Sequence, residues 1–304
     1  MRGIHGEKII AAIENNKTPS ADKERLRVAL EEYDKWVVAL DTTNAETLDE
    51  LIERMVSQLN KYKLYIDLDI VFDSSDDFLY RQKGQLKLDN TVIEEFLPKF
   101  VRKCIEKRYG RCDIKISSQI PTFSSVYFAS SLSVPEIGGG IKIKTKDQDF
   151  SMTRTLYIKS SYSPDFKESE TARLNLGYVL AELKTNLDKT MFQEASATAH
   201  DIKQAVTGAK YFLLCEWLDM TPISTATTDI DEILILRKAK RISSNIRKEY
   251  STFSGRQKNR NSYVKYLEDN PYAIDLFKRF IEHIYSQMEN EDLIEENVLD
   301  IGYF

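Results

Sequence analysis

Residues 164 to 184 read Pro-Asp-Phe-Lys-Glu-Ser-Glu-Thr-Ala-Arg-Leu-Asn-Leu-Gly-Tyr-Val-Leu-Ala-Glu-Leu-Lys. The second half is rich in branched and aliphatic residues, which predicts a β-strand that ends in charged residues. Side chains two positions apart leave a strand on the same face, so Glu182 and Lys184 should point together. Asp165 lies 17 residues before Glu182, and a turn with a short antiparallel return would bring the two carboxylates together. The stretch therefore predicts two acids and one ammonium group at the edge of a sheet.

These three groups suit the hydrolysis of a phosphodiester. A divalent cation can neutralise the anionic substrate and help to form hydroxide from water. Asp165 and Glu182 offer the hard oxygen ligands that Mg²⁺ prefers, and Lys184 can orient the attacking water or donate to the transition state. Glu168 and Glu170 lie between the two acids, and either could replace Asp165 as a metal ligand.

The same residues carry a resemblance to a known family. Pro164-Asp165, followed by Glu182-Leu183-Lys184, resembles the PD-(D/E)xK signature of the restriction-endonuclease-like nucleases. The run Ala181-Glu182-Leu183-Lys184-Thr185-Asn186-Leu187-Asp188-Lys189-Thr190-Met191-Phe192-Gln193-Glu194-Ala195 is similar to the core of type II restriction endonucleases of the BbvCI kind. The resemblance implies an α/β fold, with a mixed central sheet flanked by helices. It also implies a subunit that cuts one DNA strand beside a related but distinct subunit.

The tripeptide (D/E)xK alone is not specific. It also begins at Asp113, Asp165 and Asp201. Glu182 differs because it ends an apolar strand, has Pro-Asp behind it and precedes a helix pattern. The structural alternative is an exposed ion pair between Glu182 and Lys184, which would contribute little to stability.

The composition limits the class of protein to which the chain can belong. The chain has 304 residues, of which 42% are hydrophobic and 30% charged, with a net charge of −5. This is typical of a water-soluble globular protein with one large or two modest domains. Cys104, Cys112 and Cys215 are too few and too scattered for a disulfide framework or a zinc site, which fits a reducing cytoplasm. No apolar run has the length of a membrane span.

The charge is unevenly distributed. Residues 231 to 265 hold ten Lys and Arg against three Asp and Glu, and phosphate contacts depend on local charge rather than on the net charge. We predict that this basic segment binds DNA through Arg247, Arg256, Lys258 and Arg260. A solvated basic face is the alternative interpretation.

Hydrophobic periodicity predicts two regions. Residues 1–90 should be mainly helical, with a strand or extended segment at 65–72, and residues 91–304 should form the nuclease core. In the core we expect a helix at 91–107, a hairpin of strands at 141–146 and 153–162, a helix at 190–207, and buried strands at 211–218 and 233–236. Gln193, on the helix after the predicted catalytic strand, is a candidate polar group near the metal ions.

The sequence thus predicts a Mg²⁺-dependent endonuclease subunit acting on double-stranded DNA at a short specific site. A single site per chain predicts one strand cut per subunit, so a double-strand break needs a second nuclease subunit. The resemblance favours a heterodimer over a homodimer. Two alternatives stay open, namely a repair or junction nuclease of the same superfamily and a non-catalytic DNA-binding partner subunit.

Overall fold

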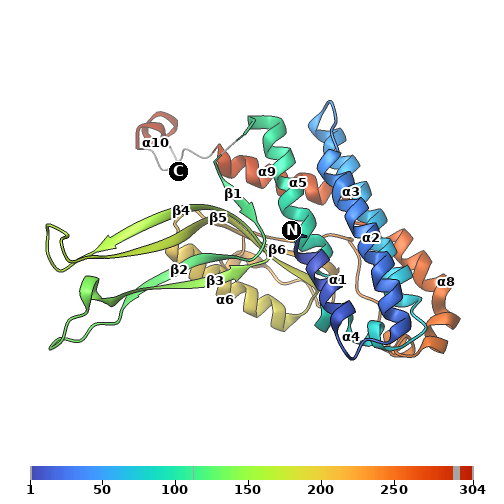
Figure 1. Cartoon of the computed structure of the whole chain (residues 1–304). Coiled ribbons are helices and arrows are strands. Elements are labelled where there is room, and N and C mark those ends of the chain that lie inside the picture. The colour runs from blue at the N-terminus through green and yellow to red at the C-terminus, as the bar shows by residue number, and fades with distance from the viewer. Residues whose placement is uncertain (1, 112, 290–294, 303–304) are drawn as a thin grey trace.

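The protein is described by a computed structural model that covers residues 2–111, 113–289 and 295–302. A five-stranded mixed sheet lies at its centre with the order β1-β4-β5-β6-β7, and helices pack around it (Figure 1). The predicted α/β fold with a helical N-terminal region is confirmed. The strands of this sheet are β1 (Lys115–Ser117), β4 (Phe150–Ser160), β5 (Glu170–Leu187), β6 (Lys210–Leu218) and β7 (Glu232–Ile235).

Strand direction changes in the middle of this sheet. The β1–β4 and β4–β5 pairs are antiparallel, whereas the β5–β6 and β6–β7 pairs are parallel. Residues Tyr211 to Trp217 of β6 are all buried, as expected for a parallel strand covered on both faces. The predicted buried strands at 211–218 and 233–236 correspond to β6 and β7.

Two β-ribbons project from the body of the protein (Figure 1). One is the outer part of the β4–β5 hairpin, and the other is a separate two-stranded sheet of β2 (Ile120–Phe128) and β3 (Ile141–Gln148). The prediction that strand 141–146 pairs with strand 153–162 is wrong, because β3 pairs with β2 and β4 pairs with β5. The chain passes from the small sheet into the large one at Asp149.

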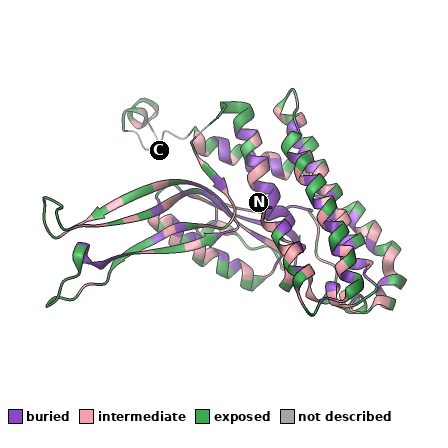
Figure 2. Ribbon diagram, in the orientation of Figure 1, coloured by how far each residue is buried: buried purple, intermediate pink, exposed green. Residues whose placement is uncertain are grey.

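The N-terminal helices pack together beside the central sheet, and the last of them contacts its strands. They are α1 (Ile4–Glu14), α2 (Ser20–Thr42), α3 (Leu48–Tyr65), α4 (Phe78–Leu86) and α5 (Thr91–Tyr109). Thr47 caps α3 by accepting a hydrogen bond from the Glu50 N–H. The largest apolar cluster contains residues from α1 to α5, from the sheet and from α9 (Ile274–Met288). Burial is accordingly greatest in this central region and least along the ribbons (Figure 2).

The predicted strand or extended segment at 65–72 is wrong. Residues Ile66–Phe72 form η1, a π-helical continuation of α3. Its alternating acids had suggested an exposed strand face, but Asp67 is buried and paired with Lys63 at 2.6 Å, one helical turn earlier. Arg237 and Glu216, from the C-terminal half of the chain, complete this buried charge cluster. The cluster links the helical region to the central sheet.

The remaining helices are α6 (Lys189–Ala205), α7 (Ser244–Glu249), α8 (Phe253–Asp269), α9 and α10 (Glu295–Ile301), with short 3₁₀ turns η2 (Ile137–Gly140) and η3 (Thr225–Thr227). Of these helices, α6 and α9 contact the central sheet, and α8 lies at one end of the molecule (Figure 1). Among the described residues, no helix has the length and apolar character to cross a membrane. Cys104 and Cys215 are buried free thiols, and Cys112 lies outside the described residues.

Candidate active site

Glu182 and Lys184 lie on the inner part of β5, just beyond its last pair with β4 (Phe150 opposite Ala181), where it pairs with β6 alone. The Lys184 ammonium Nζ lies 2.7 Å from Glu182 Oε1. The second carboxylate oxygen, Oε2, accepts a 3.0 Å hydrogen bond from the Tyr211 hydroxyl of β6. The i, i+2 spacing of the strand thus places the two charges together, as the sequence predicts.

Asp149 lies beside this pair. The register places Phe150 opposite Ala181, so the preceding residue, Asp149, lies next to Glu182. Asp149 Oδ2 accepts a 2.8 Å hydrogen bond from the backbone N–H of Leu183. One carboxylate therefore contacts the peptide bond between Glu182 and Leu183.

A third acid comes from α5. Glu94 is fully buried, and its Oε1 accepts a 2.7 Å hydrogen bond from the Asn90 amide. The same amide lies 3.4 Å from the Leu183 carbonyl oxygen. Glu94 Oε2 has no hydrogen-bond partner in the described structure. An unpartnered carboxylate oxygen in a buried position is costly, which marks this group as a candidate ligand or proton carrier.

The acids perturb one another. Burial and the negative charge of Asp149 raise the pKa of Glu94 to about 7. Burial also raises the pKa of Asp149, and the charge of Glu182 adds to this effect. Burial alone would lower the pKa of Lys184, but the hydrogen bond and charge of Glu182 outweigh it and raise that pKa. The cluster therefore carries more negative charge than Lys184 neutralises, as in a site that receives a cation.

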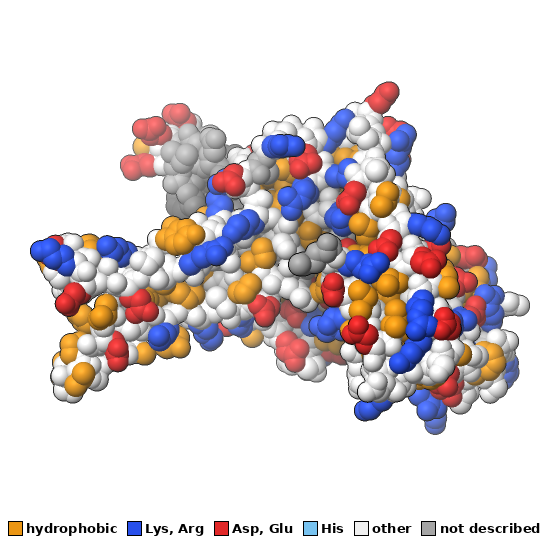
Figure 3. Space-filling model, in the orientation of Figure 1, with side chains coloured by type: hydrophobic (Ala, Val, Ile, Leu, Met, Phe, Trp, Pro, Cys, Tyr) orange, Lys and Arg blue, Asp and Glu red, His pale blue; other side chains and the backbone are white. Residues whose placement is uncertain are grey.

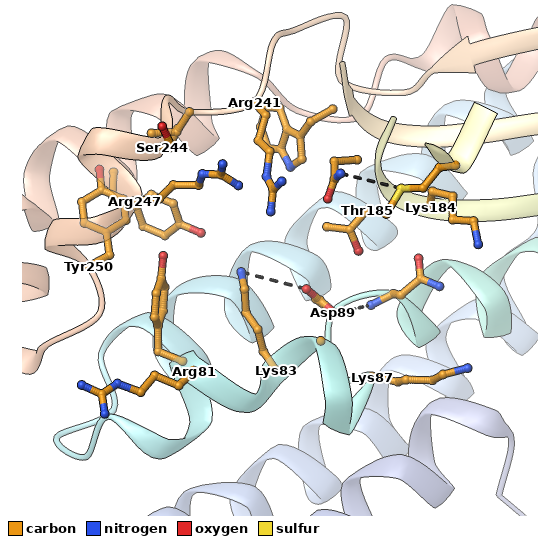
Figure 4. A pocket seen from close by; sticks show the side chains of 18 of the residues that line it. Arg81, Lys83, Lys87, Asp89, Lys184, Thr185, Arg241, Ser244, Arg247 and Tyr250 are labelled. Carbon is orange, nitrogen blue, oxygen red and sulfur yellow. Dashed lines mark hydrogen bonds and ion pairs between the residues drawn. The ribbon is translucent and has the colours of Figure 1, made fainter. Parts of the chain in front are cut away.

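A cleft of about 790 Å³ opens at this cluster. Glu94, Asp149 and Lys184 line one end, and the other end is lined by residues of α4, of α7 and of the segment before α7. Figure 4 shows Lys184 and Thr185 on one side of the cavity, with Lys83 and Arg247 pointing into it from opposite walls. The outer surface in view is electrostatically mixed, with Lys and Arg next to Asp and Glu over the helices (Figure 3). The cleft thus differs from that surface in concentrating cationic side chains.

The donor set fits a hard divalent cation. Asp149, Glu182 and Glu94 provide carboxylate oxygens, which suit Mg²⁺ when water and substrate phosphate complete its coordination. Among the described residues, however, no three His, Cys, Asp or Glu side chains converge closely enough to hold a metal by themselves. A cation here would therefore depend on oxygen atoms from substrate and water.

Asp165 is not part of this cluster. It lies in the exposed turn between β4 and β5, where Ser163 Oγ donates to its Oδ1 at 2.7 Å and Lys167 pairs with Oδ2 at 2.9 Å. Glu170, at the start of β5, lies twelve positions before Glu182 along the extended strand, which amounts to roughly 40 Å at the rise of a β-strand. The expectation that Asp165 and Glu182 share a metal ion is therefore wrong. Glu168 and Glu170 lie at the same distal end and are excluded for the same reason.

The other predicted residues have different environments. Gln193 is exposed on the first turns of α6, and none of the described hydrogen bonds joins it to the acidic cluster. Arg256 is only 1% exposed and donates to the backbone oxygens of Phe72, Ser74, Asp76 and Tyr250. Its predicted DNA contact is wrong because the guanidinium holds the protein core together.

Three basic residues remain accessible. Arg260 is partly exposed and pairs with Asp73 at 2.7 Å. Lys258 is exposed on α8. Arg247 lines the cleft that contains Lys184, and it is thus the only one of the four predicted DNA contacts that lines this cleft.

Comparison with known proteins assigns the chain to a family. The family model of the Bpu10I restriction endonuclease matches residues 85–304. The chain belongs to the Bpu10I restriction endonuclease family. Members of this family are type II restriction endonucleases, so this Bpu10I-family chain is a site-specific deoxyribonuclease. The match includes Glu94, Asp149, Glu182 and Lys184, and it favours a restriction enzyme over a repair or junction nuclease.

A solved structure has a similar fold. The chain is similar to one described as the native BbvCI A2B2 tetramer at low resolution, with a TM-score of 0.54 and 18% sequence identity. The match covers 95% of this chain and 97% of that chain. The likeness therefore extends over the N-terminal helices of this Bpu10I-family chain as well as over its sheet. No curated protein sequence matches.

Sequence reasoning missed Asp149 and Glu94, although each left a signal. Asp149 lies between two strand-like runs, but it lacks a preceding proline. Glu94 is a charged residue on the apolar face of a helix, among Val92, Ile93 and Phe96. A charged side chain on a buried face needs a partner or a function.

Proposed function

We propose that this chain is a Mg²⁺-dependent restriction endonuclease subunit that hydrolyses one strand of double-stranded DNA at a short specific site. The observation that carries the proposal is the arrangement of Asp149, Glu182 and Lys184 around the Leu183 peptide. Two acids and an ammonium group meet there, and Asp149 and Lys184 line the end of a cationic cleft. DNA as the substrate favours the cytoplasm as the compartment.

Asp149 and Glu182 would hold the metal, with Glu94 beside them. Bound Mg²⁺ would neutralise the phosphate and lower the pKa of a water molecule. The Leu183 N–H fixes the carboxylate of Asp149, and the Tyr211 hydroxyl fixes that of Glu182. Such second contacts orient ligand oxygens before substrate arrives.

Lys184 would act on the phosphate and on the attacking water. Its raised pKa keeps the ammonium group charged at neutral pH, so it can donate to the oxygen on which negative charge develops. Its pairing with Glu182 keeps it at the metal-binding edge of β5. Glu94, with a pKa of about 7, can hold or release a proton near neutral pH.

DNA would contact the basic side chains around the cleft. Arg247 lines the cleft directly, whereas Lys258 and Arg260 lie on α8 and are available for phosphates outside it. Contacts of this kind set affinity and register, and they make binding depend on salt.

A second nuclease subunit would cut the other strand. We favour a distinct subunit because the structurally similar BbvCI is described as an A2B2 tetramer. The ribbons of this chain also expose large aromatic side chains, which is typical of a surface that contacts a partner. These include Tyr127 at 55%, Phe128 at 58% and Tyr157 at 66% exposure.

The test is Lys184→Gln in the assembled enzyme, with supercoiled plasmid as substrate. If the partner is a distinct subunit, it still cuts its own strand, so the variant should nick the plasmid instead of linearising it. A homodimer would leave the plasmid uncut, which would refute the distinct partner but not the site. Linearisation at an unchanged rate would refute the site. Lys61→Gln, an exposed lysine of α3, is the matched control and should cut normally.

A further inference from the structure

The end of the cleft away from the acids is built from three cations on two walls. Lys83 comes from α4, Arg247 from α7, and Arg241 from the segment just before α7. Figure 4 shows Arg241 and Arg247 extending into the cavity from one wall and Lys83 from the opposite one. None of them belongs to the acidic cluster at the other end.

Two of the three cations have an acid partner among the described residues, and Arg247 does not. Arg241 pairs with Asp219 at 2.8 Å, and Lys83 lies 4.0 Å from Asp89. Arg247 has no ion-pair partner among the described residues, and its Nε atom is buried without a hydrogen bond. Burial and the positive charge of Arg241 lower the pKa of Arg247. Arg247 thus lies beside another cation and has a buried N–H donor without an acceptor. This is the environment expected of a side chain that binds an anionic ligand.

The surrounding walls strengthen such an interaction. Tyr80, Tyr250, Tyr263 and Trp217 line the cleft around the three cations. Aromatic walls lower the local dielectric constant beside the guanidinium groups, and charge-assisted hydrogen bonds are stronger where that constant is low. The planar guanidinium is also the side chain best suited to the oxygens of a phosphate.

We infer that Arg247, Arg241 and Lys83 form a subsite for a second phosphate of the DNA strand that this subunit cuts. The inference rests on the proposed function, in which DNA is cut at Lys184 and Asp149. These two residues and the three cations line the same cleft, so the backbone of one DNA strand can contact both ends of it. The phosphates of the complementary strand lie across a groove that is about 6 to 12 Å wide in B-DNA, away from the strand that enters the cleft. The subsite therefore positions the strand that is cut and makes no contact with the complementary strand.

The first test measures DNA binding without metal, by fluorescence anisotropy on a cognate duplex. Arg247→Gln should weaken binding about 10- to 100-fold, as expected for the loss of a charged hydrogen bond. It should also reduce the salt dependence of log K by about one unit. Arg247→Lys keeps the charge and should recover part of the affinity. Arg27→Gln, a surface arginine of α2, should bind like the unaltered protein.

The second test locates the phosphate. Neutral methylphosphonates are placed singly at each position of both strands, and binding is compared for the unaltered protein and Arg247→Gln. One position on the cut strand should weaken the unaltered protein and have little further effect on the variant, because that contact is already lost. Equal losses for both proteins at every position would overturn the inference, and so would a sensitive position confined to the complementary strand.

This outcome is separable from the proposed catalytic site. Lys184→Gln should keep the methylphosphonate position that depends on Arg247, since it alters only the other end of the cleft. If Lys184→Gln cut normally while the map still depended on Arg247, the catalytic assignment would fail and the phosphate subsite would stand. A melting temperature within about 2 °C for Arg247→Gln checks that the fold is intact.

Discussion

Asp149 Oδ2 accepts a 2.8 Å hydrogen bond from the Leu183 N–H, so an acid just before β4 is fixed against the peptide bond between Glu182 and Leu183. This contact crosses two antiparallel strands and is independent of the long hairpin that joins them. It explains how an acid 33 residues before Glu182 can share its environment.

The contact predicts which aspartate the reaction requires. Asp149→Asn should lower cleavage by this subunit at least about 10²-fold, because it removes a charge that the metal and transition state need. Asp165→Asn should cleave at the unaltered rate, since Asp165 lies in the distal turn. Strand-specific cleavage of an end-labelled duplex measures both. Loss of activity in Asp165→Asn with retention in Asp149→Asn would reverse our assignment.

The turn around Asp165 also shows why its sequence was misleading. The Phe166 N–H donates to the Ser163 carbonyl oxygen at 3.1 Å, which places Pro164 and Asp165 at the two central positions of a β-turn. Proline and aspartate are common in turns for local reasons, namely a fixed φ angle and side-chain hydrogen bonds to nearby backbone. Pro164 and Asp165 thus occur together because they form a β-turn, and the pair is no sign of a catalytic motif here.

Features determined within one element could be predicted from the sequence. The i, i+2 pairing of Glu182 and Lys184 follows from strand geometry, and the helix at 190–207 and the buried strand at 211–218 follow from their apolar patterns. Contacts between distant segments could not be predicted. The approach of Glu94 to Asp149 depends on how α5 packs against the sheet, and no local pattern specifies this.

Glu94 should make stability depend on pH in the absence of divalent cations. Its pKa rises from 4.5 in the unfolded chain to about 7 in the folded protein. Between these pH values the native state holds a proton that the unfolded chain has lost, so stability should fall as pH rises and reach its lower level above pH 7. The loss should be on the order of 3 kcal/mol.

Urea unfolding in EDTA at pH 5 and pH 8 tests this effect. Glu94→Gln should lose less stability than the unaltered protein between the two pH values, because it has no proton to release. Glu106→Gln, an exposed position on the same helix, is the control and should keep the full pH dependence. An identical pH dependence for Glu94→Gln and the unaltered protein would argue against a perturbed Glu94.

Arg256 should matter for folding rather than for DNA binding. It is 1% exposed and bridges α8 to the segment after η1 through backbone oxygens. Arg256→Gln should destabilise the protein by about 3–5 kcal/mol, because it leaves buried acceptors unpaired. Lys258→Gln, two residues later and exposed, should change stability by less than about 0.5 kcal/mol. Equal unfolding midpoints for the two variants would contradict this role.

Cation binding at the acidic cluster should release a proton. Glu94 is largely protonated at pH 6, and a metal ion favours the ionised form of nearby carboxylates. Ca²⁺, used as a probe, should therefore bind more tightly at pH 8 than at pH 6 and release about one proton per ion at the lower pH. Calorimetry in two buffers with different ionisation enthalpies measures this release. Glu94→Gln should abolish it, whereas Asp165→Asn should leave it intact. Ca²⁺ binding without proton release at pH 6 would show that Glu94 is ionised before the cation arrives.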